Sequence, residues 1–181
     1  GDKVDLRRQV ENLHSAADTG FAVTRRDPDR KPGTGNQVDV AQRLHQALNR
    51  TGIQHNVPAH GAVLLGDAAL LEAMVDHLVR VASALAAATG EPSHFDLVED
   101  PTGQNWHIWF SVAGTALPQW HVREAFAPYY VTRILRGSPH GLSLVLVDAV
   151  ARGHGGRGLS DRETIEGEDR ILIGAALPRS A

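Results

Sequence analysis

The sequence contains no cysteine, and this absence excludes two common kinds of bond and site. A chain without thiols forms no disulfide and no zinc site with thiolate ligands. It also has no apolar run near the roughly 18 residues that a membrane-spanning helix needs, so we expect no direct insertion into a membrane. Both absences are typical of a cytoplasmic domain.

An excess of charge of one sign is also lacking. Lysine and arginine number 18 against 21 aspartate and glutamate, which leaves a net charge of −3 and gives no reason to expect nucleic-acid binding. Aromatic residues are few, at 5%. Trp106 and Trp109 resemble a base-stacking pair, but their odd spacing on one expected strand points them to opposite faces of the sheet. A hydrophobic content of 42% in 181 residues is enough for one domain with a core.

The chain divides into three parts by composition. Residues 1–27 have helical spacing of apolar side chains and predict an N-terminal amphipathic helix. Proline, glycine and aspartate gather before residue 37, so residues 28–36 are predicted to be a linker. Residues 37–181 form the predicted globular domain. The N-terminal helix is interpreted as the end of a dimerisation helix, or alternatively as a helix that packs on its own domain.

Strand and helix patterns alternate along the globular part. Asp67 is a predicted N-cap for the longest helix, and a turn-rich segment at 100–105 predicts a hairpin. The expected fold is an α/β (α+β) two-layer sandwich, in which a mixed sheet carries its helices on one face. The expected helices are 38–49, 68–88 and 142–152, with a short helical patch near 122–126, and the expected strands are 52–57, 62–65, 94–99, 106–112, 158–160 and 170–177.

Five stretches in this order are similar to the sequence boxes of one ATPase family. Together they resemble the histidine-kinase catalytic and ATP-binding domain, a member of the GHKL superfamily (Bergerat fold) that includes gyrase, MutL and heat-shock chaperones. The resemblance covers about residues 37–178. The stretches are Gly66-Asp67 with the helix that follows, Val112-Ala-Gly-Thr-Ala-Leu-Pro118, Glu124-Ala-Phe-Ala-Pro-Tyr-Tyr130, Gly141-Leu-Ser-Leu144 and His154-Gly-Gly156.

The resemblance also shows where this chain departs from the family. The asparagine that holds magnesium in the family matches Val81, and the aspartate that accepts a hydrogen bond from adenine matches Val112. The first asparagine of the same box matches His77, and the basic and aromatic residues that follow match Ala84 and Leu85. At the glycine boxes Gly114 and Gly141 are kept, whereas Ala116, Pro139 and Ser143 stand at glycine positions.

These replacements remove the chemistry that the resemblance implies. Magnesium prefers hard oxygen ligands, and Val81 has none. The side chain of Val112 cannot accept a hydrogen bond from adenine. Pro139 has no backbone N–H to donate to a phosphate. We therefore expect a degenerate nucleotide pocket formed by His77, Val81, Val112, Gly114, Ala116, Gly141 and Ser143.

Other candidate sites have weaker support in the sequence. His14 is a candidate phosphoacceptor, although Glu11-Asn-Leu-His14-Ser-Ala lacks the acidic residue and the proline that kinases usually show after the histidine. Residues 153–158 fit the spacing G-x-G-x-x-G, but the expected order is helix then strand, which favours a helix end and turn over a dinucleotide site. His55 and His60 have no acidic or cysteine partner at ligand spacing, so no metal site is predicted.

The expected function is a histidine-kinase-like domain of two-component signalling that does not hydrolyse ATP. It would act as a regulatory, partner-binding or phosphotransfer scaffold, with a response regulator or a partner kinase as its partner and the N-terminal helix forming a homodimer. No cofactor is expected. Two alternatives stay open: an active sensor histidine kinase with a divergent pocket that binds ATP and magnesium, and a phosphotransferase that uses His14 or a histidine upstream of the sequence.

Overall fold

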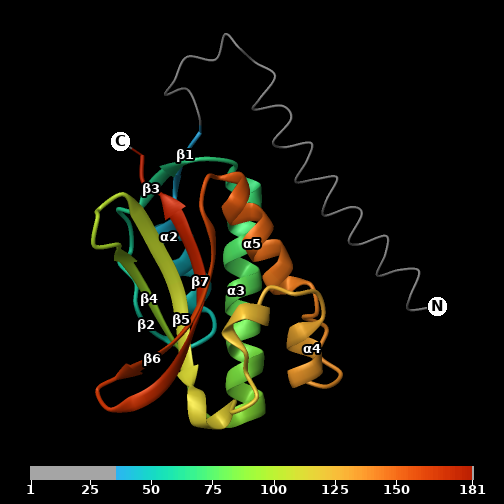
Figure 1. Ribbon diagram of the computed structural model, residues 1–181. Coiled ribbons are helices and arrows are strands. Elements are labelled where there is room, and N and C mark those ends of the chain that lie inside the picture. The colour runs from blue at the N-terminus through green and yellow to red at the C-terminus, as the bar shows by residue number, and fades with distance from the viewer. Residues whose placement is uncertain (1–35, 181) are drawn as a thin grey trace, which may run out of the picture.

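A computed structural model describes residues 36–180, which form a two-layer α/β sandwich (Figure 1). The helices lie on one face of a five-stranded sheet, and a separate two-stranded sheet lies near the chain's entry into the domain. The elements are β1 (Gln37–Asp39), α2 (Val40–Asn49), β2 (Gln54–Asn56), β3 (Val63–Leu65), α3 (Ala68–Thr89), β4 (His94–Glu99), β5 (Asn105–Ala113), η1 (Gly114–Ala116), η2 (Val122–Glu124), α4 (Tyr130–Ile134), α5 (Ser143–Gly153), β6 (Arg157–Ile165) and β7 (Glu168–Pro178).

The larger sheet is mixed, as the sequence predicts. Its strand order is β2-β4-β5-β7-β6, with β2 parallel to β4 and every other neighbour antiparallel. The two-stranded sheet pairs β1 with β3 in antiparallel register. Helix α3 packs against both α2 and α5 and against strand β5, so it is the central helix of the helical layer.

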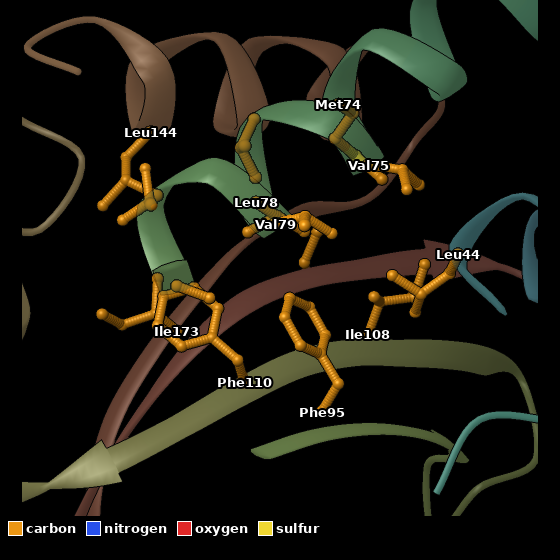
Figure 2. Packing of buried hydrophobic residues seen from close by; sticks show 14 of the residues in the cluster. Leu44, Met74, Val75, Leu78, Val79, Phe95, Ile108, Phe110, Leu144 and Ile173 are labelled. Carbon is orange, nitrogen blue, oxygen red and sulfur yellow. The ribbon is translucent and has the colours of Figure 1, made fainter. Parts of the chain in front are cut away.

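The core lies between α3 and the sheet. Figure 2 shows Leu78 and Val79 of α3 above Phe95 of β4 and Ile108 and Phe110 of β5. The rings of Phe95 and Phe110 are 5.4 Å apart between centroids. The apolar stripe expected along the longest helix is confirmed, because each of its members is fully buried: Leu71, Met74, Leu78, Val81 and Leu85.

Side-chain caps fix where the main helices begin. Asp67 caps α3 by accepting a hydrogen bond from the Leu70 N–H at 3.0 Å, which confirms the predicted N-cap. Asp39 caps α2 through the Gln42 N–H and also accepts from the Gly61 N–H at 2.8 Å, so it ties the helix to the loop before β3. Helix α3 ends at Thr89 and is followed by Gly90, whose φ of 71° suits a glycine C-cap.

The structure corrects three expected elements. Val38, expected in the first helix, lies in β1, because Asp39 caps the helix one residue later. Helix α4 lies in the stretch expected to be mostly irregular. Strand β6 runs five residues farther than the expected 158–160 at its C-terminal side, to Ile165. Residues 161–164 are exposed and polar, so apolar alternation does not mark them as a strand.

Other sequence predictions have different outcomes. Trp106 packs against the buried core and Trp109 lies beside His107, with ring centroids 5.4 Å apart, in agreement with opposite faces. The predicted N-terminal helix at 1–27, the linker and His14 lie outside the described residues, so the division of the chain at residues 27 and 37 stays a prediction. Between residues 36 and 180 there is no helix whose length and hydropathy would let it cross a membrane.

Candidate functional site

The predicted pocket positions lie on or next to four elements, which are α3, β5, η1 and α5. His77 and Val81 lie on α3, and Val112 lies near the end of β5, directly before Gly114 and Ala116 of η1. Ser143 is the first residue of α5, and Gly141 lies two residues before it. Contacts of α3 with both β5 and α5 bring these segments together.

Val81 and Val112 are both fully buried, with an exposed fraction of 0%. They belong to one continuous apolar cluster, and Val112 pairs in register with Ile171 of β7, which is also fully buried. Neither valine carries a donor or an acceptor for a metal or a base. At these two positions the structure therefore has hydrocarbon packed against hydrocarbon.

His77 and Ser143 are in direct contact across the two helices. His77 Nδ1 and Ser143 Oγ are 2.9 Å apart, a hydrogen bond between residues 66 positions apart in sequence. Burial, and after it the positive charge of Arg80, lowers the pKa of His77, so the neutral imidazole is favoured. His77 is the one ionisable side chain among the seven predicted pocket positions, and this hydrogen bond joins α3 to α5 directly.

Gly114 is held in place by an ion pair of the β6–β7 hairpin. Arg162 Nε and Asp169 Oδ1 are 3.2 Å apart, and Arg162 Nη2 donates to the Gly114 carbonyl at 3.1 Å. A Cβ at position 114 would overlap the Asp169 carboxylate. The pair therefore occupies the space beside this backbone, and only glycine fits there without displacing it.

Gly141 is also packed against a side chain of this protein. A Cβ at position 141 would lie 2.8 Å from Cδ1 of the Tyr129 ring, closer than the two atoms can approach. The Tyr129 N–H donates to the Gly141 carbonyl at 2.8 Å. Tyr129 has a φ of 64°, a left-handed conformation that is rare for a bulky residue and that the surrounding contacts must stabilise.

An aromatic cluster, which sequence reasoning missed, orders the segment between the two glycine boxes. Trp120 and Tyr130 are both buried, and their rings meet edge to face with centroids 5.1 Å apart. The Tyr130 hydroxyl accepts from the His121 N–H at 2.6 Å and donates to the Gln119 carbonyl. The Phe126 ring lies against Gly158 of β6. The adjacent tyrosines in the phenylalanine-box-like stretch were the available signal, but their partners come only from the fold.

The G-x-G-x-x-G stretch at residues 153–158 lies at a helix end and turn. Residues 153–158 follow α5 and lead into β6, which confirms the expected order of helix then strand. His154 Nδ1 lies 2.8 Å from the Val150 carbonyl, and His154 Nε2 accepts from the Asp67 N–H at 3.0 Å. This ring therefore joins the end of α5 to the start of α3. Within residues 36–180 no group of three or more histidine, aspartate or glutamate side chains has the geometry to hold a metal ion.

The arrangement of helices and strands matches solved structures, although no family model and no curated protein matches the sequence. The fold is that of histidine-kinase catalytic, ATP-binding domains. The mycobacterial sensor histidine kinase MprB is 20% identical with a TM-score of 0.55, and the match covers 80% of this chain and 99% of that chain. The ATP-binding domain of PrrB from Mycobacterium tuberculosis is 18% identical with a TM-score of 0.54, covering 82% of this chain and 99% of that chain. The nucleotide-free catalytic domain of the histidine kinase ThkA is 15% identical with a TM-score of 0.55, covering 80% and 95%. At these identities the likeness establishes the fold.

Proposed function

We propose that this protein is a histidine-kinase-like domain of two-component signalling that does not turn over ATP and acts as a regulatory or partner-binding scaffold. The observation that carries the proposal is the complete burial of Val81 and Val112 in one apolar cluster. By the family resemblance these are the positions of the magnesium ligand and the adenine acceptor. A domain that uses ATP as a phosphate donor needs a magnesium ligand and an adenine acceptor that both face the nucleotide. Here neither side chain is present at the matching position.

The retained glycines do not favour the alternative of an active kinase. In active relatives such glycines let the backbone approach the nucleotide. Here a Cβ at position 114 would overlap the Asp169 carboxylate and one at position 141 would crowd the Tyr129 ring, so both glycines have close neighbours within this chain. The His77–Ser143 hydrogen bond supports the same proposal, because it holds α3 and α5 together without a ligand.

The proposed partner is a response regulator or another kinase, and the proposed location is the cytoplasm. In this proposal the domain binds its partner through its surface and transfers no phosphate from ATP. The Trp120–Tyr130 contact helps to order the domain. Residues 1–27 would supply the dimer contact. A phosphotransfer role would require His14 or a histidine upstream of the sequence as the phosphoacceptor, with this fold as its scaffold.

Thermal unfolding of the full chain with and without millimolar Mg-ATP tests the proposal. A ligand at 100 times its dissociation constant stabilises the native state by about 2.7 kcal/mol. For a domain of this size each kcal/mol moves the midpoint by roughly 2–4 °C, so real binding shifts it by at least about 5 °C. We expect a shift within noise for Mg-ATP and for ADP. A saturable shift matched by calorimetric heat would refute the proposal in favour of the active kinase, and a shift that does not depend on magnesium would indicate a nucleotide used as a structural or regulatory ligand.

A further inference from the structure

Three polar side chains converge on the face of the larger sheet that points away from the helices. Phe95 of β4 is buried in the core beside α3, so its neighbours His94 and Asp96 point to the other face (Figure 2). Asn56 of β2 pairs in register with Asp96 and therefore lies on that same face. The pairing of β2 with β4 thus places an imidazole, a carboxylate and an amide side by side.

The polar atoms of these three side chains have the spacing of a metal site. Asn56 Nδ2 lies 3.2 Å from His94 Nε2 and 3.3 Å from Asp96 Oδ1, and the last two atoms are 3.6 Å apart. A triangle with these sides has a circumscribed radius of about 2.0 Å, so one ion can lie about 2.1 Å from all three corners, the usual zinc–ligand distance. The sides then subtend roughly 100–120° at the ion, close to the tetrahedral angle that zinc adopts.

Asn56 can supply an oxygen ligand at its corner of the triangle. A half-turn about the bond between Cβ and Cγ exchanges the amide nitrogen and oxygen, which are nearly equal in size. With the nitrogen at the corner, Asn56 donates hydrogen bonds to both neighbours. With the oxygen there, three acceptors converge, and a cation holds them together. The third ligand is an amide, so the site is compatible with the lack of a metal-holding group of three histidine, aspartate or glutamate side chains within residues 36–180.

Solvent reaches the three side chains, as an open zinc site requires. The side chains of His94 and Asp96 are 34% and 28% exposed, and Asn56 is exposed. Three protein ligands leave the fourth tetrahedral position for a water molecule. An ion at this place would also join β2, an edge strand of three residues, to β4, its neighbour in the sheet.

We propose that His94 Nε2, Asp96 Oδ1 and the side-chain oxygen of Asn56 bind one zinc ion, with water as the fourth ligand. Imidazole is a ligand that suits zinc, and the carboxylate offsets part of the charge of the ion. The ion stabilises the pairing of β2 with β4 at this edge of the sheet. The site lies on the sheet face away from α3, so it goes beyond the proposed function and does not depend on whether a nucleotide binds.

Isothermal titration of the full chain with zinc chloride, after removal of metal with EDTA, tests this site. We expect saturable binding of one ion, and zinc at 100 times its dissociation constant should raise the melting midpoint by at least about 5 °C. His94→Gln and Asp96→Asn should each weaken binding by at least about tenfold, because loss of a group that only orients a ligand already costs about 10–100-fold. His107→Gln is the matched control and should leave binding unchanged, since His107 lies on the same sheet face but pairs with Val98 instead of a ligand.

Asn56→Asp distinguishes a zinc ligand from a hydrogen-bond donor. A carboxylate adds charge to the ligand set, so we expect zinc to bind about tenfold more tightly to this variant. Without zinc, two neighbouring carboxylates repel each other, so the melting midpoint in EDTA should fall. If Asn56 acts only as a hydrogen-bond donor, the variant loses those bonds and zinc does not restore the midpoint.

Absence of saturable zinc binding to the unchanged chain would overturn the proposal. Binding that His94→Gln and Asp96→Asn leave unchanged would also overturn it, because the ion would then lie elsewhere. Weaker zinc binding by Asn56→Asp would contradict the role of Asn56 as a ligand. None of these outcomes involves a nucleotide, so the zinc and Mg-ATP titrations test the two proposals separately.

Discussion

The replacement of Val81 by asparagine tests whether this position is part of the core. Val81 is fully buried within the apolar cluster. An amide placed there without a partner costs about 1–3 kcal/mol, and the lost burial of the valine side chain adds about 1.5 kcal/mol or more. The sum is a destabilisation of at least about 2.5 kcal/mol, which lowers the melting midpoint by roughly 5 °C or more. The assay is thermal and urea unfolding of Val81→Asn beside the unchanged chain.

Ser83→Asn is the matched control, because Ser83 lies two residues farther on the same helix and is exposed. It introduces the same asparagine at a solvent-facing position of the same helix. There we expect the free energy of unfolding to change by no more than about 0.5 kcal/mol. An unchanged or higher midpoint for Val81→Asn would refute the reasoning, since it would mean that solvent or a ligand reaches the position. A Mg-ATP shift gained by this variant would likewise show that the pocket is open around residue 81.

Two further predictions concern assembly and pH. The apolar spacing of residues 1–27 predicts a dimer in sedimentation for the full chain and a monomer for a chain beginning at Gln37, and identical profiles would end the dimerisation hypothesis. Stability should also fall as the pH falls through 6.5, because a folded state whose histidines have a lowered pKa binds fewer protons than the unfolded chain. Urea midpoints at about pH 7.5 and about pH 5.5 measure this, and equal midpoints would contradict the sign. The histidines with a lowered pKa, each first by burial, are His55, His77, His107 and His140.

The parts of the fold that local chemistry determines could be predicted from the sequence. Asp67 caps α3 where the sequence places it, because a cap needs only a short polar side chain before an apolar helical stripe. The β4–β5 hairpin was predictable for a similar reason. Asp100 accepts hydrogen bonds from Asn105, Thr102 and Gln104 within the turn, and these bonds, first that of the Asn105 side chain, hold the pKa of its carboxyl well below its usual range.

The parts that depend on distant contacts could not be predicted. Helix α4 begins after Tyr129, whose left-handed backbone is maintained by its packing on Gly141, and no local propensity indicates that conformation. The second half of β6 is held by pairing with β7 and by the hydrogen bond of Arg162 to the Gly114 carbonyl, both of which are distant contacts. Sequence reasoning singled out both His77 and Ser143, but as two separate losses. Only the fold shows that they bond to each other.

That pairing changes how departures from a family motif are counted. If each residue of the family motifs is counted as independent evidence, the retained Gly114 and Gly141 favour nucleotide binding. The replaced residues His77 and Ser143 then count against it. In the structure the two glycines lie against the Asp169 carboxylate and the Tyr129 ring of this chain, so their presence is not specific to a nucleotide. The structure also makes His77 and Ser143 one change, since either side chain alone would leave a partly buried polar group without this partner. The two buried valines are therefore the main support for a domain that binds no nucleotide. The unfolding midpoint and Mg-ATP binding of the Val81→Asn variant test this directly.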